Sequence, residues 1–241
     1  MTVIEVTNLH KRYRDLIAVE DVSFTVERGE IFGIVGRNGA GKTTTVECVG
    51  GLRRPEGGSI RVLGMPPHDQ RVRQRLGFQL QETQLHDRIK VGEAMRLFSA
   101  FYAEPADWRE LVEAVGLSDK LRTPYAKLSG GQKQRLSVAL ALVGRPEVAI
   151  LDELTTGLDP EARRDVWGLV RRIRDRGVTV VLVTHLMDEA ERLCDRIAVI
   201  HRGRVAALDS PSGLVARAVV PGVDRPTLED AVLALTTSER I

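Results

Sequence analysis

The chain has few cysteines, no long hydrophobic run and almost no excess of charge, and each shortage excludes a class of protein. Cys48 and Cys194 are its only two cysteines and lie far apart, outside any CxxC pair. Neither a disulfide framework nor a zinc site is expected, and a reducing cytoplasm fits. The most apolar run, 178–183, is far shorter than the roughly 20 residues that span a bilayer. Residues 1–6 lack the basic and apolar regions of a signal peptide. Any action at a membrane therefore requires a separate partner.

Charge is nearly balanced along the sequence. The 35 Lys and Arg residues are interspersed with 33 Asp and Glu, for a net charge of +2, so no nucleic-acid partner is expected. Arginine-rich runs at 71–75 and 171–174 are interpreted as solvated helix faces, with a weak contact to anionic lipid as the alternative. A length of 241 residues and a hydrophobic content of 43% suit one large α/β domain, or one with a smaller inserted lobe.

A glycine-rich stretch gives the first positive indication of function. It reads Gly36-Arg37-Asn38-Gly39-Ala40-Gly41-Lys42-Thr43-Thr44 and fits the P-loop pattern G-x-x-x-x-G-K-[ST]. An apolar, strand-like run precedes it at 31–35, and the segment 42–49 can continue as a helix. Glycine permits backbone conformations that turn N–H groups toward a phosphate, and the helix start adds the positive end of its dipole. The pattern predicts a triphosphate site, with Lys42 at the β/γ-phosphates and Thr43 on Mg²⁺; a chance glycine-rich turn is the alternative.

The remaining chain reads as an α/β protein. Alternation at 3–6 and 18–26 predicts strands, and further strands are expected at 59–63 and 76–80. From about residue 83 to 125 the pattern becomes helical, which indicates a helical lobe inserted between two strands of a core sheet. Tyr13 lies beside basic residues, where an aromatic side chain more often packs on the surface than stacks on a nucleobase.

A second glycine-containing stretch precedes another helix. In Leu128-Ser129-Gly130-Gly131-Gln132, the side chains of Ser129 and Gln132 form an S-x-x-Q capping box, so a well-capped helix is the simplest interpretation. The two glycines also leave open backbone amides at a helix N-terminus. They predict a second anion site, distant in sequence from the first.

Two later strands end in residues that can carry chemistry. The apolar run 148–151 ends at Asp152 and Glu153, as expected for a buried parallel strand whose carboxyl end faces a ligand. We expect Asp152 to hold Mg²⁺, and Glu153, which points to the other face, to polarise the attacking water. A loop then starts a helix at Pro160. The strand at 178–184 leads to His185, the histidine whose position favours a functional role.

Taken together, these motifs resemble those of the ATP-binding subunits of ABC transporters over roughly residues 3–210. The match consists of the Walker A loop 36–43, the Q-loop glutamine Gln81, the signature 128–132, Walker B 150–153, the D-loop 157–159 and the switch histidine His185, in the family's order. The resemblance implies a mainly parallel core sheet with an N-terminal antiparallel β subdomain and a helical subdomain at about 83–135. The ATPase domain would cover 1–210, followed by a short C-terminal extension, 211–241.

The resemblance also implies roles for individual residues. Tyr13 becomes an expected adenine-stacking residue, and Gln81 an expected catalytic residue and metal ligand beside Thr43 and Asp152. Glu153 would act as general base, while Lys42 and His185 would hold the γ-phosphate. The residues Ser129, Gly130, Gly131 and Gln132 would cover the ATP of an opposing subunit, and Asp159 would communicate across that interface. Pro usually follows the catalytic glutamate in this family, and here the residue is Leu154.

The expected partners are a second copy or a related ATPase subunit, and a separate integral membrane permease that holds the chain at the cytoplasmic face of the membrane. The stretches 152–160, 184–191 and 227–233 resemble those of ATPases that serve ABC-2 type exporters, such as daunorubicin-resistance ATPases. An importer subunit, a lipid or polysaccharide exporter subunit, and a soluble ABC ATPase acting on ribosomes or DNA are the alternatives. No guanine-specific N-K-x-D pattern is present, which disfavours a GTPase. The membrane subunits would select the substrate.

Overall fold

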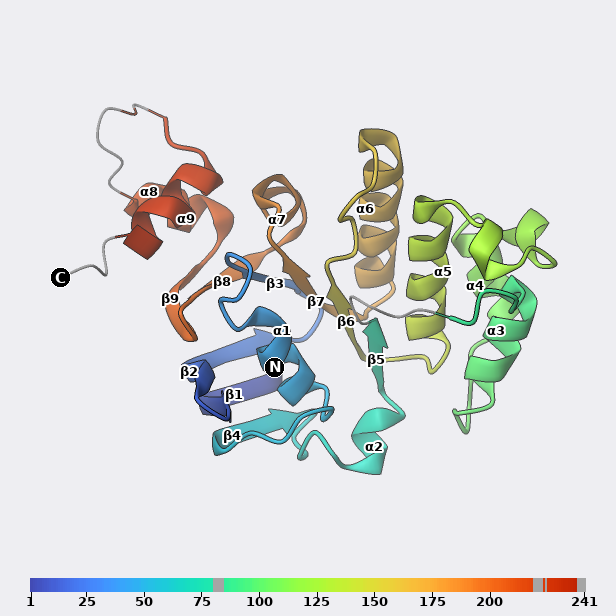
Figure 1. The fold of residues 1–241 in the computed structure, drawn as a ribbon, viewed down its shortest axis with the longest axis horizontal. Helices are drawn as coiled ribbons and strands as arrows, with labels where there is room; N and C mark the ends of the chain where they lie inside the picture. Colours follow the sequence, from blue (N-terminus) through green and yellow to red (C-terminus); the bar gives the residue numbers. More distant parts are fainter. Residues whose placement is uncertain (80–84, 219–222, 224, 238–241) are drawn as a thin grey trace.

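The structure, a computed structural model, describes residues 1–79, 85–218, 223 and 225–237. Within these ranges the strands form one sheet in the order β4-β1-β2-β9-β8-β3-β7-β6-β5 (Figure 1). In chain order the strands are β1 (Thr2–Tyr13), β2 (Leu16–Glu27), β3 (Ile31–Val35), β4 (Gly57–Val62), β5 (Leu76–Gln79), β6 (Val148–Asp152), β7 (Thr179–Thr184), β8 (Arg196–His201) and β9 (Arg204–Asp209).

The sheet has an antiparallel and a parallel part. Strand β1 pairs antiparallel with β2 and with β4, whereas β5, β6, β7, β3 and β8 are parallel neighbours. Every residue of β3, β6 and β7 is buried, as expected for parallel strands that are covered on both faces. The fold class predicted from the sequence is confirmed.

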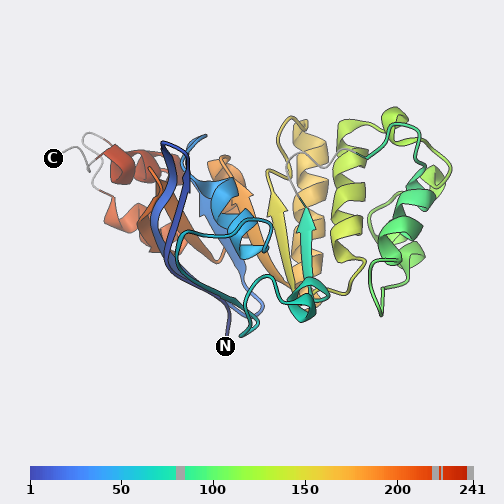
Figure 2. The same cartoon turned by 60° about the horizontal axis from the view of Figure 1, so that its bottom comes forward.

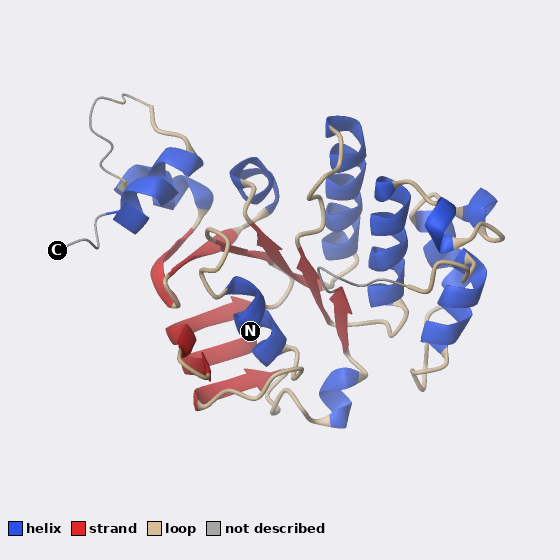
Figure 3. Ribbon diagram, in the orientation of Figure 1, coloured by secondary structure: helices blue, strands red, loops and turns tan. Residues whose placement is uncertain are grey.

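Helices cover the sheet and extend from it at both ends. The helices are α1 (Lys42–Val49), α2 (Gln70–Arg73), α3 (Val91–Ser99), α4 (Trp108–Ala114), α5 (Gly130–Leu142), α6 (Pro160–Asp175), α7 (Met187–Leu193), α8 (Pro211–Arg217) and α9 (Leu228–Thr237), with short 3₁₀ turns at Ser118–Lys120 and Tyr125–Lys127. Figures 1 and 2 place α3 and α4 at one end of the molecule and α8 and α9 at the other. Figure 3 shows that the end with α3 and α4 contains helices and loops only.

Two apolar clusters fill the interior. One lies among β1, β2, β4, α1 and one face of the core strands, and includes the stacked rings of Phe24 and Phe32, whose centroids are 5.3 Å apart. The other packs the opposite face of the core strands against α3 to α9. The P-loop helix α1 and the helix α7, which follows His185, therefore rest on opposite faces of β3.

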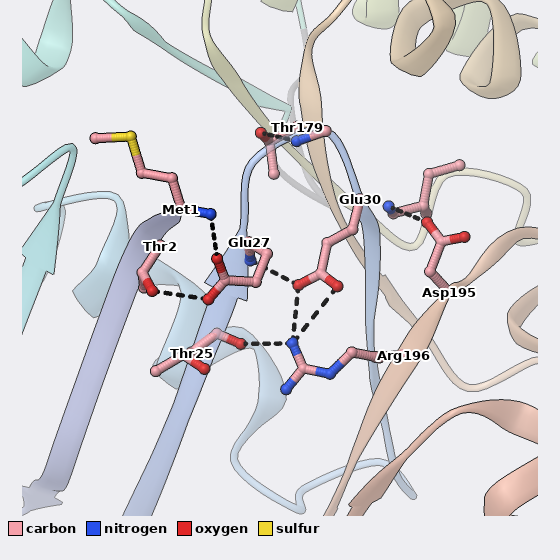
Figure 4. Close-up of polar contacts among 10 residues, drawn as sticks. Met1, Thr2, Thr25, Glu27, Glu30, Thr179, Asp195 and Arg196 are labelled. Atoms are coloured by element: carbon pink, nitrogen blue, oxygen red, sulfur yellow. Dashed lines mark hydrogen bonds and ion pairs between the residues drawn. The ribbon is translucent and has the colours of Figure 1, made fainter.

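Polar contacts fix the start of β3, at the end away from the P-loop (Figure 4). The Glu30 carboxylate accepts hydrogen bonds from Arg196 Nη1 at 3.1 Å and from the Glu27 amide at 2.7 Å, and Asp195 accepts one from the Ile31 amide at 2.8 Å. These contacts tie the antiparallel strands to the core. They give the strand that carries the P-loop a fixed position.

In the described ranges we find no helix with the length and hydropathy needed to span a membrane.

Candidate active site

The predicted P-loop lies between β3 and α1, in the strand, loop and helix order that its sequence requires. Gly41 has a left-handed φ of 104°, and a Cβ atom at this position would collide with the carbonyl oxygen of Ala18. Glycine is therefore needed here both for the backbone conformation and for the close approach of β2. The helix begins directly afterwards, at Lys42, so its first amides face the inside of the loop.

Lys42 is buried beneath this loop. Its Nζ donates a hydrogen bond to the Arg37 carbonyl oxygen at 3.2 Å, and only 5% of the residue is exposed. Burial lowers the pKa of this ammonium group, while the nearby carboxylates of Glu153 and Asp152 raise it. The site thus holds a desolvated cation between the loop carbonyl and two acidic side chains.

Asp152, at the end of β6, is fully buried. Neither of its carboxylate oxygens has a hydrogen bond of good geometry among the described residues, although the Thr43 hydroxyl lies near enough to favour the charged form. Burial raises the pKa of Asp152 to about 6, with Glu153 adding to the effect and Thr43 and Lys42 opposing it. A buried carboxylate without a partner suits a hard cation that prefers oxygen ligands. No cluster of three His, Cys, Asp or Glu side chains forms a metal site in the described ranges, so hydroxyl, phosphate and water oxygens would have to complete the coordination.

Glu153 and His185 meet at the ends of the neighbouring strands β6 and β7. Glu153 Oε1 lies 3.2 Å from His185 Nδ1, and the Glu153 side chain is only 9% exposed. Glu153 adopts a left-handed φ of 50°, which is uncommon for a residue with a side chain. Its amide donates to the Val183 carbonyl oxygen at 2.9 Å, which fixes this turn against β7. Adjacent strands thus bring together two residues that are 32 positions apart in the sequence.

A pocket of about 450 Å³ opens beside the loop. Gly36, Arg37, Asn38 and His185 line one side of it. Its other wall comes from Met187 and from four residues of α9, namely Glu229, Val232, Leu233 and Thr236. The spacing of these four residues, i, i+3, i+4 and i+7, places them on one helix face. From the sequence we expected 211–241 to be a short extension and did not predict that it lines this pocket. The i, i+3, i+4, i+7 spacing is nevertheless visible in the sequence.

The signature residues form a separate small pocket of about 180 Å³. Ser129, Gly130 and Gly131 line it together with the loop residues Gly157, Leu158 and Asp159. The predicted capping box is confirmed, because the Gln132 amide donates to Ser129 Oγ at 3.3 Å and the Ser129 amide donates to Gln132 Oε1 at 3.0 Å. Asp159 caps α6 by accepting hydrogen bonds from the amides of Glu161 and Ala162. This pocket shares no lining residue with the pocket beside the P-loop.

The remaining predicted site residues have different outcomes. Gln81 lies outside the described residues. Tyr13 ends β1 and is 36% exposed, with Lys11 Nζ 5.3 Å and the Arg53 guanidinium 5.9 Å from the ring centroid. It does not line the pocket beside the P-loop. Its role as an adenine platform stays a prediction.

The fold and this site define a class: an α/β protein whose P-loop faces the carboxyl ends of parallel strands that carry Asp152, Glu153 and His185. The comparison with protein families agrees, because residues 19–156 match the ABC transporter family. The chain belongs to this family and is the ATP-binding subunit of an ABC transporter, an ATPase.

Individual relatives support the assignment. The chain is 39% identical to the Nod factor export ATP-binding protein I of Burkholderia lata, covering 99% of this chain and 83% of that protein. It is also 39% identical to the probable multidrug ABC transporter ATP-binding protein YbhF of Escherichia coli, of which it spans 42%. A solved ATP-binding subunit of an ABC transporter superposes with a TM-score of 0.85 at 29% identity, covering 97% of this chain and 99% of that one. A dimeric bacterial ABC transporter cassette matches with a TM-score of 0.78 at 26% identity, covering 86% and 98%.

Proposed function

We propose that the chain powers an exporter of the ABC-2 type, by closing on ATP as a head-to-tail dimer. Two of the relatives are named for export of Nod factor and for multidrug transport, which supports export over import. The stretches 152–160, 184–191 and 227–233 support the ABC-2 subclass.

The observation that carries the dimer is the separation of the two phosphate-facing pockets. The P-loop pocket and the signature pocket of one chain have no residue in common. We propose that a phosphate bound at the P-loop meets the signature residues of a second chain, because within one chain the two sets line separate pockets. Ser129, Gly130, Gly131 and Gln132 of one subunit would then cover the ATP held by the other, with Asp159 beside the same interface. A solved relative is described as a dimer, which supports this arrangement.

In this proposal the P-loop residues 36–44 bind the phosphates through backbone amides, and Lys42 supplies the nearest positive charge. The metal would be Mg²⁺, held by Asp152, Thr43 and Gln81. When bound, Mg²⁺ neutralises charge that builds up on the phosphate oxygens during transfer.

Glu153 is the proposed general base. Its carboxylate would take a proton from the attacking water, and His185 would hold the γ-phosphate from the side of β7. The distance of 3.2 Å between Glu153 Oε1 and His185 Nδ1 supports their joint action, because it places the proposed base directly beside a residue that lines the pocket. Leu154, which stands where the family usually has proline, is fully buried and removes no chemical group from the site.

The proposed partners follow from the dimer and from the family. They are a second copy of this chain or a related ATPase subunit, and an integral membrane permease that would hold the chain at the cytoplasmic face of the membrane. We propose no nucleic-acid partner, since the 35 basic residues exceed the 33 acidic ones by only two. The ATPase domain would comprise 1–210 with a helical subdomain at about 83–135, and 211–241 would be the extension that includes α9.

Substitution of the proposed base tests this function. Glu153→Gln removes the proton acceptor but keeps the shape of the side chain, so ATP should still bind while hydrolysis stops. We expect the variant to form a stable dimer with Mg·ATP, measured by light scattering, and to remain monomeric with ADP. Turnover near that of the unchanged chain would exclude Glu153 as the base.

A further inference from the structure

A buried glutamate behind the candidate site is used by none of the roles described above. Glu189, on α7, is 1% exposed. Its Oε1 accepts hydrogen bonds from Thr155 Oγ1 at 2.7 Å and from Trp167 Nε1 at 2.9 Å. Its Oε2 is buried too and has no hydrogen-bond partner within the described parts of the chain. A buried carboxylate with one oxygen unsatisfied is costly, and an apolar side chain would fill the same space without that cost.

One of the two donors lies in the loop that follows the proposed base, and the other lies on the next helix, α6. Thr155 is fully buried and lies two residues after Glu153, in the loop that ends at Asp159. Trp167 belongs to α6, which begins directly after Asp159. Glu189 itself lies four residues after His185. One carboxylate oxygen therefore joins the loop that follows Glu153 to the helix that follows His185.

The backbone at Glu153 explains why such an anchor matters. A left-handed φ at a residue with a side chain is strained and persists only when the surroundings hold it. Hydrogen bonds of this turn, such as Thr156 N to Glu153 O at 3.4 Å and Leu158 N to Thr155 O at 3.2 Å, are long. The shorter bond from Thr155 to Glu189 fixes the turn from behind.

We infer that Glu189 is a positioning residue for ATP hydrolysis: through Thr155 it sets the Glu153 carboxylate relative to His185. This inference rests on the roles proposed for Glu153 and His185. Glu189 touches no nucleotide, because its carboxylate is buried among Thr155 and Trp167. Its effect on the reaction is exerted through the backbone turn.

The two hydrogen bonds to Glu189 can be broken separately, which separates positioning from simple support of the fold. Thr155→Val keeps the shape of the side chain and removes the bond to the catalytic loop. Trp167→Phe removes the bond to α6 and leaves the loop attached. Arg171→Ala is the matched control, because Arg171 Nη2 donates one hydrogen bond, at 2.9 Å, to the Arg192 carbonyl oxygen and so joins α6 to α7 away from the loop.

The experiment measures ATP hydrolysis at saturating Mg·ATP, ATP affinity and thermal stability for the full chain. We expect Thr155→Val to lower kcat about ten- to a hundredfold, the size of effect that a misplaced catalytic group produces, with little change in ATP affinity. Trp167→Phe and Arg171→Ala should lower thermal stability slightly and keep kcat within about threefold. Glu189→Gln, which retains an acceptor oxygen for Thr155, should recover most of the activity that Glu189→Leu loses.

Equal kcat values for Thr155→Val, Trp167→Phe and Arg171→Ala would overturn the inference and leave Glu189 as a tie between helices. The inference would also be overturned if Glu189→Gln and Glu189→Leu lost activity equally, and only in proportion to the loss of folded protein. A different result would contradict the proposed function: a Glu153→Gln variant that still hydrolyses ATP. An inactive Glu153→Gln variant together with a fully active Thr155→Val variant would reject the positioning role alone.

Discussion

The P-loop region and the signature region of this chain are built in different ways. The P-loop region is assembled from strands far apart in the sequence, and its charged side chains Lys42 and Asp152 are buried, at 5% and zero exposure, although the loop residues 37–39 are exposed. The signature region depends on neighbours in the sequence: Ser129 and Gln132 cap their own helix, and Ser129 and Gly130 are exposed. A buried site can desolvate and hold a ligand within one chain, whereas an exposed helix start is suited to a surface that a second chain covers. The difference predicts that changes in the two regions have separable effects.

The largest expected effect comes from the buried region. Lys42→Ala removes the buried cation and should lower ATP hydrolysis by at least about a hundredfold, as loss of a preorganised charge at a phosphate does. ATP affinity, measured by titration of a fluorescent ATP analogue, should fall as well. Helix content by circular dichroism should not change, since the Lys42 side chain donates to the Arg37 carbonyl oxygen of its own loop and to no helix carbonyl among the described residues. Normal hydrolysis by this variant would mean that the phosphates bind elsewhere.

An intermediate effect is expected in the exposed region. Ser129→Arg places a long side chain at the pocket formed with Gly157 to Asp159, so it should block closure of two chains. ATP affinity of the single chain should remain, while hydrolysis should fall more than about tenfold because the second subunit's amides no longer reach the phosphate. ATP-dependent dimerisation of Ser129→Arg in the Glu153→Gln background is the measurement. Undiminished dimerisation would contradict the head-to-tail arrangement.

The smallest effect concerns stability in the absence of nucleotide. Burial raises the pKa of Asp152 to about 6, so folding favours the protonated form. The stabilisation that this group contributes is therefore present below its unfolded pKa, near 4, and is lost as pH rises through about 6. Asp152→Asn should stabilise the nucleotide-free chain at pH 7.5 by at most about 3 kcal/mol, and by less at pH 5. Thermal unfolding at both pH values tests this, and an equal change at both would show that Asp152 ionises normally.

The sequence predicted much of this molecule because its signals are local. The P-loop pattern, the buried strands before Glu153 and His185, the helix start at Pro160 and the capping box at Ser129 each depend on residues within a few positions. The family and the fold class were confirmed by the comparisons. The wall that α9 adds to the P-loop pocket was missed, since nothing near residue 229 indicates which distant surface that helix face contacts.

The amino-acid sequence by itself determined where helices begin and which runs form buried strands, and it predicted the residues that bind phosphate, because glycine, proline, capping side chains and apolar runs act on their own neighbourhood. Only the tertiary structure decided that Glu153 and His185 lie 3.2 Å apart and that Asp152 loses contact with water. It also decided that the Glu189 carboxylate accepts hydrogen bonds from Thr155 and Trp167. These features depend on strand order and helix packing, which join residues of distant segments, and on the burial that makes each polar contact strong.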